Sequence, residues 1–226
     1  MAKARGRKTS SGGKKTDGAG LEALVLAAAL DLIADGGWRK LTLAAIARKA
    51  GVSLAQVRTL FPGRGAVLEA FFLAIDRRAA AEGAYAADDP NPVRDRLFDV
   101  LMRRFDALAP YHGAMKALIK DLPREPETAA WCAMRLARSI AWTLESAGLS
   151  ASGVLGRVRV KGLMAIYLNG LRVWLADDSA DKGPTMAALD KGLRVAESLI
   201  TTLKGVFPAG RPAAGKGSRK TIDPAP

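Results

Sequence analysis

The residues with the clearest chemistry are basic side chains concentrated between positions 39 and 64. This segment carries six basic residues and no acidic one. Binding to a phosphate backbone requires a compact surface of positive charge. An ordinary helical hairpin with a solvated basic face is the alternative interpretation. The six residues are Arg39, Lys40, Arg48, Lys49, Arg58 and Arg64.

Two short helices joined by a tight turn are predicted to position these side chains. Leu43, Ile46, Ala47 and Ala50 recur at helical spacing, which predicts a first helix that packs inward. Gly51 follows directly, and a glycine tolerates the left-handed backbone that such a turn needs. The pattern is typical of a helix-turn-helix.

The second helix is predicted to begin after Ser53, because Gln56 completes an S-x-x-Q capping box. Val57, Leu60 and Phe61 are predicted to face inward, which leaves the rest of the helix outside. We expect phosphate contacts from Thr42, Ser53, Thr59 and Arg64, and base contacts from Leu54, Ala55, Gln56 and Arg58, with Arg39 completing the predicted DNA-binding set.

Catalytic and metal-binding patterns are missing from the sequence. His112 is the only histidine and Cys132 the only cysteine, so no multi-histidine or zinc spacing exists. No phosphate-loop pattern is present either. We therefore expect a protein that is not an enzyme, with no catalytic residue, no metal and no cofactor.

Cysteine content and hydropathy predict a cytoplasmic protein without a membrane span. A single cysteine permits no intrachain disulfide, which fits a reducing compartment. The first residues are charged rather than apolar, unlike a secretory signal. No apolar run approaches the ~20 residues that cross a bilayer.

The net charge of +13 over 226 residues is unevenly distributed. Residues 1–16 carry +6, residues 39–64 carry +6 and residues 204–226 carry +4, so the remainder is mildly acidic at −3. Such asymmetry favours nucleic acid as a partner, with an anionic membrane surface as the weaker alternative.

Periodicity along the chain predicts an all-α fold of about nine helices, without strands or repeats. Beside the two helix-turn-helix segments, the expected helices span about 21–35, 66–84, 93–108, 111–122, 127–147, 154–176 and 185–206. The expected domains are a disordered basic arm (1–18), a helix-turn-helix DNA-binding domain (19–65), a helical effector-binding and dimerisation domain (66–206) and a disordered basic tail (207–226).

Aromatic and methionine residues of the larger domain could surround a pocket for a small apolar effector. For any one of these residues, the alternative is that it simply packs in the hydrophobic core, as apolar residues at helical spacing usually do. Cys132 lies among them, and the predicted pocket residues are Tyr111, His112, Met115, Trp131, Met134, Trp142, Met164 and Tyr167.

The last two long helices, 154–176 and 185–206, have broad apolar faces that predict a homodimer through a four-helix interface. Gly156, Gly162 and Gly170 would permit a close approach of helices there. Twofold symmetry would place two recognition helices one DNA turn apart, at ~34 Å.

The string I-A-x-x-A-G-V-S, followed by a terminal Phe, resembles the TetR family of transcriptional regulators. The resemblance implies a dimer that binds a palindromic DNA operator, and most simply a repressor that a small effector releases. This chain departs from the family where it has Arg58 in place of an aromatic residue and Ala55 in place of a Gly. The matching positions, within about 21–72, are Leu41-Thr42, Ile46-Ala47, Ala50-Gly51-Val52-Ser53, Leu60-Phe61 and Leu68.

A second resemblance points to a lipid-binding accessory protein of ubiquinone biosynthesis, which shares the TetR fold without acting as a repressor. It rests on Gly37-Trp38, on residues 60–63 and on an acidic segment near residue 178. Members of that family tend to lack basic residues in the recognition helix, whereas Arg48, Lys49 and Arg58 are present here. The basic residues therefore favour DNA binding over lipid binding alone.

Overall fold

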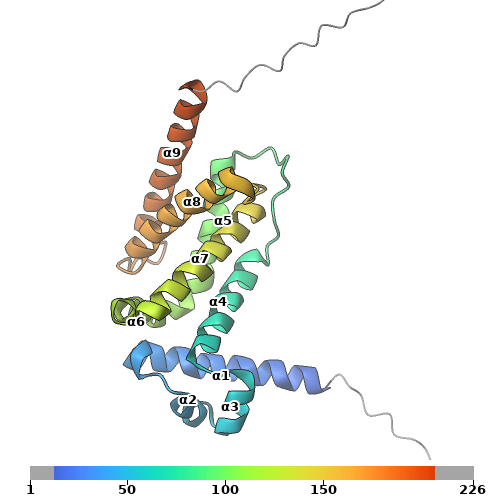
Figure 1. The fold of residues 1–226 in the computed structure, drawn as a ribbon, viewed down its shortest axis with the longest axis vertical. Coiled ribbons are helices and arrows are strands. Elements are labelled where there is room, and N and C mark those ends of the chain that lie inside the picture. Colours follow the sequence, from blue (N-terminus) through green and yellow to red (C-terminus); the bar gives the residue numbers. More distant parts are fainter. Residues whose placement is uncertain (1–12, 207–226) are drawn as a thin grey trace, which may run out of the picture.

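The computed structural model describes residues 13–206, with side chains for 18–199, and this part of the chain is helical without strands (Figure 1). Short 3-10 helices at Trp38–Lys40, Ala109–Tyr111 and Leu122–Arg124 join some of the longer elements. The α-helices are α1 (Gly13–Gly36), α2 (Leu43–Ala50), α3 (Leu54–Leu60), α4 (Arg64–Ala80), α5 (Val93–Leu108), α6 (His112–Asp121), α7 (Pro126–Ser146), α8 (Gly153–Trp174) and α9 (Gly183–Val206).

The predicted all-α class is confirmed, but two helix boundaries were predicted wrongly. Helix α1 begins at Gly13, so residues 13–18 continue a helix rather than belong to a disordered arm. Helices extend past their apolar stripe once they are nucleated, and periodicity misses that extension. Helix α4 ends at Ala80 instead of 84, and Gly83 follows with φ +91°. The remaining tail residues, 1–12 and 207–226, lie outside the described part.

Helices α1, α2 and α3 form a small unit at one end of the molecule, and α4 leads from it into the larger helical body (Figure 1). Its core includes Val25 of α1, Ile46 of α2 and Val57 of α3, each fully buried. Trp38 is 2% exposed and closes this core. The buried apolar contacts fix the angle between α2 and α3, which the sequence assigns to DNA recognition.

The larger body shares one continuous apolar core with the small unit. Helix α6 packs along α1, α4 packs on α5, and α8 packs on α9. Phe105 of α5 stacks on Tyr167 of α8 with ring centroids 5.3 Å apart. No helix in the described region is long and apolar enough to cross a membrane.

Two of the three glycines of α8 make close contacts within the chain rather than with a second subunit. A Cβ at Gly170 would lie 2.7 Å from Leu189 Cδ2, so this glycine permits close packing of α8 on α9 within the chain. Gly156 is likewise buried, against Ala151. Gly162 alone among the three faces open space, so it alone remains available for a second subunit.

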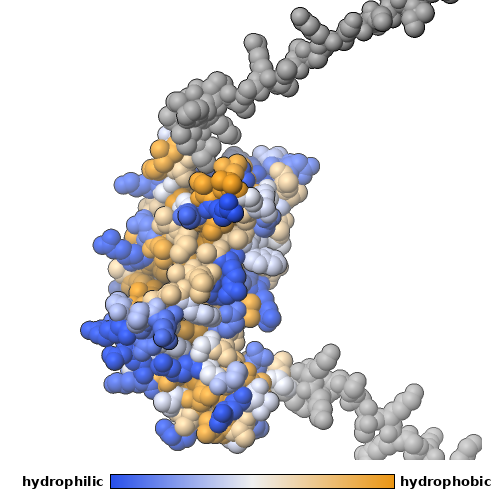
Figure 2. Space-filling view, in the orientation of Figure 1, coloured by the Kyte–Doolittle hydropathy of each residue, from blue (hydrophilic) through white to orange (hydrophobic). Residues whose placement is uncertain are grey.

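Large apolar side chains remain exposed along α8 and α9, and Figure 2 shows apolar patches over the start of α8 and along α9. Exposed apolar patches can mark an interaction surface. The exposed residues are Val154, Leu155, Val158 and Leu168 on α8, with Val195 and Leu199 on α9. We call these six residues the α8–α9 apolar face.

Candidate nucleic-acid interface

Helix α2 begins and ends with the two features that the sequence indicates. The Thr42 hydroxyl oxygen accepts a hydrogen bond from the Ala45 N–H at 3.1 Å and caps the helix. Gly51 ends it with φ 69° and ψ 27°, a left-handed conformation that a glycine adopts without a Cβ clash. The turn then delivers the chain directly into α3.

Helix α3 begins with the predicted capping box. Ser53 Oγ accepts from the Gln56 N–H at 3.2 Å, and Gln56 Oε1 accepts from the Ser53 N–H at 2.9 Å. Val57 and Phe61 are buried beneath the helix, and Leu60 is half-buried. Two of the N–H groups that a helix start leaves without partners are therefore satisfied locally.

The capping box restricts what Ser53 and Gln56 can offer to DNA. Gln56 Oε1 also accepts a hydrogen bond from the Ser53 hydroxyl at 2.9 Å, so this oxygen is engaged within the box. The Gln56 amide nitrogen makes no hydrogen bond with the described residues and stays available to a base. Thr59 donates its hydroxyl hydrogen to the Ala55 carbonyl at 3.0 Å, which leaves the oxygen lone pairs free for a donor.

The outer side of α3 is exposed and cationic. Leu54, Ala55, Gln56, Arg58 and Thr59 are all exposed. Within the described part of the chain, the Arg58 guanidinium forms no ion pair. The side chains predicted to contact bases therefore lie on one accessible surface, which we call the α3 face.

The neighbouring helix α2 adds two cations to this surface. Arg48 is exposed and has no carboxylate partner among the described residues. Lys49 has only a distant one, because its Nζ lies 3.9 Å from Asp31 on α1. Two exposed groups at that separation attract each other weakly, so Lys49 stays available to an external anion.

Arg64 lies apart from the α3 face, at the seam between the small unit and the larger body. Its guanidinium stacks over Trp38 with 5.0 Å to the ring centroid, and Nη1 donates to the Trp38 carbonyl at 3.5 Å. Nη2 lies 3.5 Å from Glu125 Oε2, at the residue that precedes α7. A carboxylate of the larger body therefore partly neutralises this predicted phosphate contact.

Arg39 is held at the same seam. Its backbone N–H donates to Asp121 Oδ2 at 3.1 Å, and its Nε lies 3.9 Å from Glu125 Oε1. A Cβ at Gly37 would lie 2.7 Å from Asp121 Oδ2, so glycine allows this carboxylate to approach. Sequence analysis did not find Asp121 and Glu125, because they lie more than eighty residues from Arg39 and carry no local motif.

The comparisons with known proteins agree with this geometry. Residues 25–71 match the family model described as bacterial regulatory proteins, tetR family. No curated protein matches the chain. The segment that matches the family model contains α2, α3 and the loop that joins them.

Solved structures show that most of the chain has the fold of TetR transcriptional regulators. A TetR transcriptional regulator from Nitrosomonas europaea is similar with TM-score 0.64 and 23% identity, over 79% of this chain and 98% of that one. One from Streptomyces coelicolor has TM-score 0.58 and 19% identity over 84% of both chains. One from Rhodococcus sp. RHA1 has TM-score 0.56 and 16% identity over 80% and 96%.

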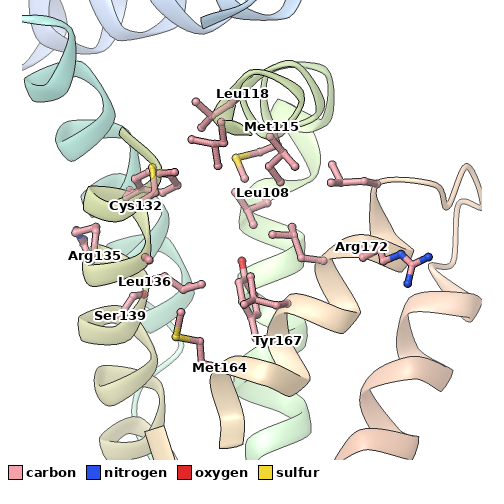
Figure 3. Close-up of a pocket in the computed structure, with 18 of the residues that line it drawn as sticks. Leu108, Met115, Leu118, Cys132, Arg135, Leu136, Ser139, Met164, Tyr167 and Arg172 are labelled. Atoms are coloured by element: carbon pink, nitrogen blue, oxygen red, sulfur yellow. The ribbon is translucent and has the colours of Figure 1, made fainter. Parts of the chain in front are cut away.

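The larger body contains a cavity of about 350 Å³ among α5, α6, α7 and α8 (Figure 3). Its wall is mostly aliphatic, with Leu108, Leu118, Leu136 and similar side chains. Three of the predicted pocket residues line it, namely Met115, Met164 and Tyr167, together with Cys132. The volume falls within the usual range of ligand sites, about 300–1,000 Å³.

Three other predicted pocket residues are not among those that line this cavity. Tyr111 packs edge-on against Phe71 at 5.3 Å between centroids. A ring nitrogen of His112 lies 3.1 Å from the Trp174 carbonyl oxygen. Trp131 lies against Phe72 at 6.2 Å, outside the set of lining residues. These side chains hold helices together rather than line the cavity.

Met134 and Trp142 are likewise absent from the lining of this cavity, since both lie on the outer side of α7. They are 63% and 71% exposed. Helix α7 carries apolar residues on more than one face, so spacing alone does not determine which face is inside. Its cavity side is instead formed by Cys132, Leu136 and Ser139.

A polar cluster beside the cavity was missed altogether. The Asp76 carboxylate of α4 accepts hydrogen bonds from Arg104 Nη1, from Arg135 Nη2 at 2.5 Å and from Ser139 Oγ at 2.5 Å. Burial disfavours the charged carboxylate, but the charge of Arg104 and these hydrogen bonds outweigh it and lower the pKa of Asp76. We call these four residues the Asp76 cluster.

Proposed function

We propose that this chain is a TetR-family transcriptional regulator that binds double-stranded DNA through the α3 face. The observation that carries the proposal is the exposed guanidinium of Arg58 on a capped helix, without an ion pair in the described residues. A side chain in this position can reach guanine O6 and N7 in the major groove. Arg48, Lys49 and Thr42 lie nearby and supply phosphate contacts.

Two copies form the functional unit in this proposal. The α8–α9 apolar face is the surface that the second copy covers, since Val158 and Val195 are more than half exposed. A twofold axis through this face brings two α3 helices to the spacing of successive major grooves, about 34 Å. A palindromic operator would match that symmetry.

The domain roles follow from the same proposal. Residues 19–65 bind DNA, and residues 66–206 bind an effector and dimerise. The effector site is the 350 Å³ cavity, and Leu122, which lines it, follows directly after Asp121 of the seam. A ligand that moves this segment changes the position of Arg39 and Arg64, so that binding of a small apolar effector releases a repressor from its operator.

The proposal is tested by selecting bound fragments from the source genome with the purified full-length chain. A selected duplex and a scrambled duplex of equal length are then titrated at two salt concentrations by fluorescence anisotropy. We expect a palindromic motif, tighter binding to the selected duplex and a loss of affinity at higher salt on both duplexes. Failure to enrich any motif, with equal binding to both duplexes, contradicts the proposal.

The apolar cavity also supports a second candidate, a lipid- or quinone-binding protein of the same fold that does not bind DNA. Native mass spectrometry of the purified protein separates the two. A copurified isoprenoid together with no salt-dependent DNA binding would favour the second candidate. The cationic α3 face favours the first, since a lipid carrier has no need for Arg48 and Arg58 on that surface.

A further inference from the structure

The cavity has one polar side in an otherwise aliphatic wall. Arg104 of α5 and Arg135 of α7 line it with Ser139, and these arginines are only 4% and 6% exposed. Arg104 also lies over the Tyr167 ring, with its guanidinium carbon 5.3 Å from the centroid. Buried guanidinium groups are costly unless an anion compensates them.

The carboxylates around these arginines compensate them incompletely. Asp76 is the shared partner of both guanidinium groups. Glu69 approaches Arg135 Nε at 3.2 Å, but its side chain is 38% exposed, so water screens this pair. The Nε atoms of Arg104 and Arg135 are buried and form no hydrogen bond, because Glu69 meets Arg135 Nε as an ion pair without hydrogen-bond geometry. Two buried guanidinium groups thus share one well-placed carboxylate, and one N–H donor of each remains without an acceptor.

We propose that the cavity binds an apolar molecule that carries one acidic group, with its anion on the side of Arg104 and Arg135 and its apolar part against Leu118, Leu136 and Met164. The inference rests on the proposed function, since it names the chemical class of the effector. An acidic group can accept charge-assisted hydrogen bonds from these guanidinium groups. A neutral analogue accepts weaker hydrogen bonds, and a cationic analogue is repelled by the two arginines.

The test uses three ten-carbon probes that differ only in the head group: decanoate, decanol and decylamine, each below its micellar concentration. Isothermal titration calorimetry on the full-length chain, without DNA, gives the three dissociation constants. We expect decanoate to bind about tenfold or more tighter than decanol, as for a hydrogen bond to a charged group, and decylamine to bind weakest.

Two variants assign the preference to a residue. Arg104→Gln should reduce the ratio between decanol and decanoate dissociation constants toward one. Arg172→Gln is the matched control, because Arg172 also lines the cavity but its guanidinium points away from the other labelled side chains (Figure 3). We expect this control to keep the wild-type ratio.

Equal binding of decanoate and decanol to the wild-type chain overturns the inference and shows that Asp76 and Glu69 already satisfy both arginines. The result needs no variant, so it holds even if Arg104→Gln fails to fold. Absence of binding by all three probes also overturns it. DNA binding is measured separately, so a regulator that binds its operator but shows no preference for the acid refutes this inference and leaves the proposed function intact.

Discussion

Arginine has opposite environments in the small unit and in the larger body. Arg48 and Arg58 are exposed, and no described carboxylate pairs with either guanidinium. Arg104 and Arg135 are buried around Asp76. A cation left exposed and without a partner suits an anion outside the molecule, whereas a buried cation needs an anion beside it to offset the loss of water. The arginines of the small unit are therefore accessible to an external partner, whereas those of the larger body are held by neighbouring carboxylates.

The largest effect is expected from removing the internal anion. Asp76→Asn leaves Arg104 and Arg135 without their shared carboxylate, and breaking a buried pair in this way costs about 3–5 kcal/mol of unfolding free energy. Urea unfolding followed by circular dichroism measures the change. Asp95→Asn is the control, since Asp95 is exposed and, among the described residues, pairs with Arg94 alone; we expect a change of at most about 1 kcal/mol. Equal effects of the two substitutions would refute the distinction between buried and exposed pairs.

The second prediction separates stability from DNA binding within α3. Ser53→Ala removes the cap oxygen and should cost about 0.5–2 kcal/mol of stability. Gln56→Glu keeps an oxygen that accepts from the Ser53 N–H, so stability should hold while the added negative charge weakens DNA binding. Thermal unfolding and anisotropy measure the two properties. A Gln56→Glu chain that binds DNA like wild type would place position 56 outside the interface.

The seam between the two regions should give a smaller effect. Glu125→Gln removes the carboxylate shared by Arg39 and Arg64, and exposed ion pairs of this kind are worth about 0.2–1 kcal/mol. We expect DNA affinity to rise by up to about fivefold in anisotropy titrations. Glu127→Gln is the control, because it changes net charge equally from an exposed position without an ion pair in the described residues. Equal gains from both variants would point to net charge alone.

The smallest effect concerns acid stability outside both regions. Hydrogen bonds from Ser179 and Thr185 lower the pKa of Asp177 to about 2. A lowered folded pKa contributes stability that is present above about pH 4, near the pKa of an unfolded aspartate, and is lost as the pH falls toward 2. Asp177→Asn should therefore flatten the decline of unfolding free energy in that window, as measured by urea titrations. Asp178→Asn, at a position without a hydrogen bond in the described region, should not.

Local features of the small unit could be predicted because their partners are close in sequence. Thr42 caps an amide three residues on, and Ser53 and Gln56 are also three apart. The type of residue at such spacing determines the hydrogen bond without knowledge of the fold. The same holds for Gly51, which ends α2.

The polar contacts of the larger body could not be predicted for the opposite reason. Asp76 meets Arg104 and Ser139 across 28 and 63 residues, and a polar residue on an apolar helix gives no sign of its distant partner. The exposure of Trp142 could not be predicted either, because a hydrophobic residue type favours burial without determining which side of its helix faces the core. Tertiary packing alone determines these contacts.

The central claim is that the α3 face reads DNA, and the effect of Arg58→Ala on the affinity for a selected duplex relative to a scrambled one tests it most directly. We expect a loss of about 1–3 kcal/mol on the selected duplex and a much smaller loss on the scrambled one. Arg77 is an exposed arginine near the C-terminal end of α4, away from the small unit. Arg77→Ala should leave both affinities close to wild type. An equal loss on both duplexes would reduce Arg58 to a backbone contact, and no loss on either would contradict the account.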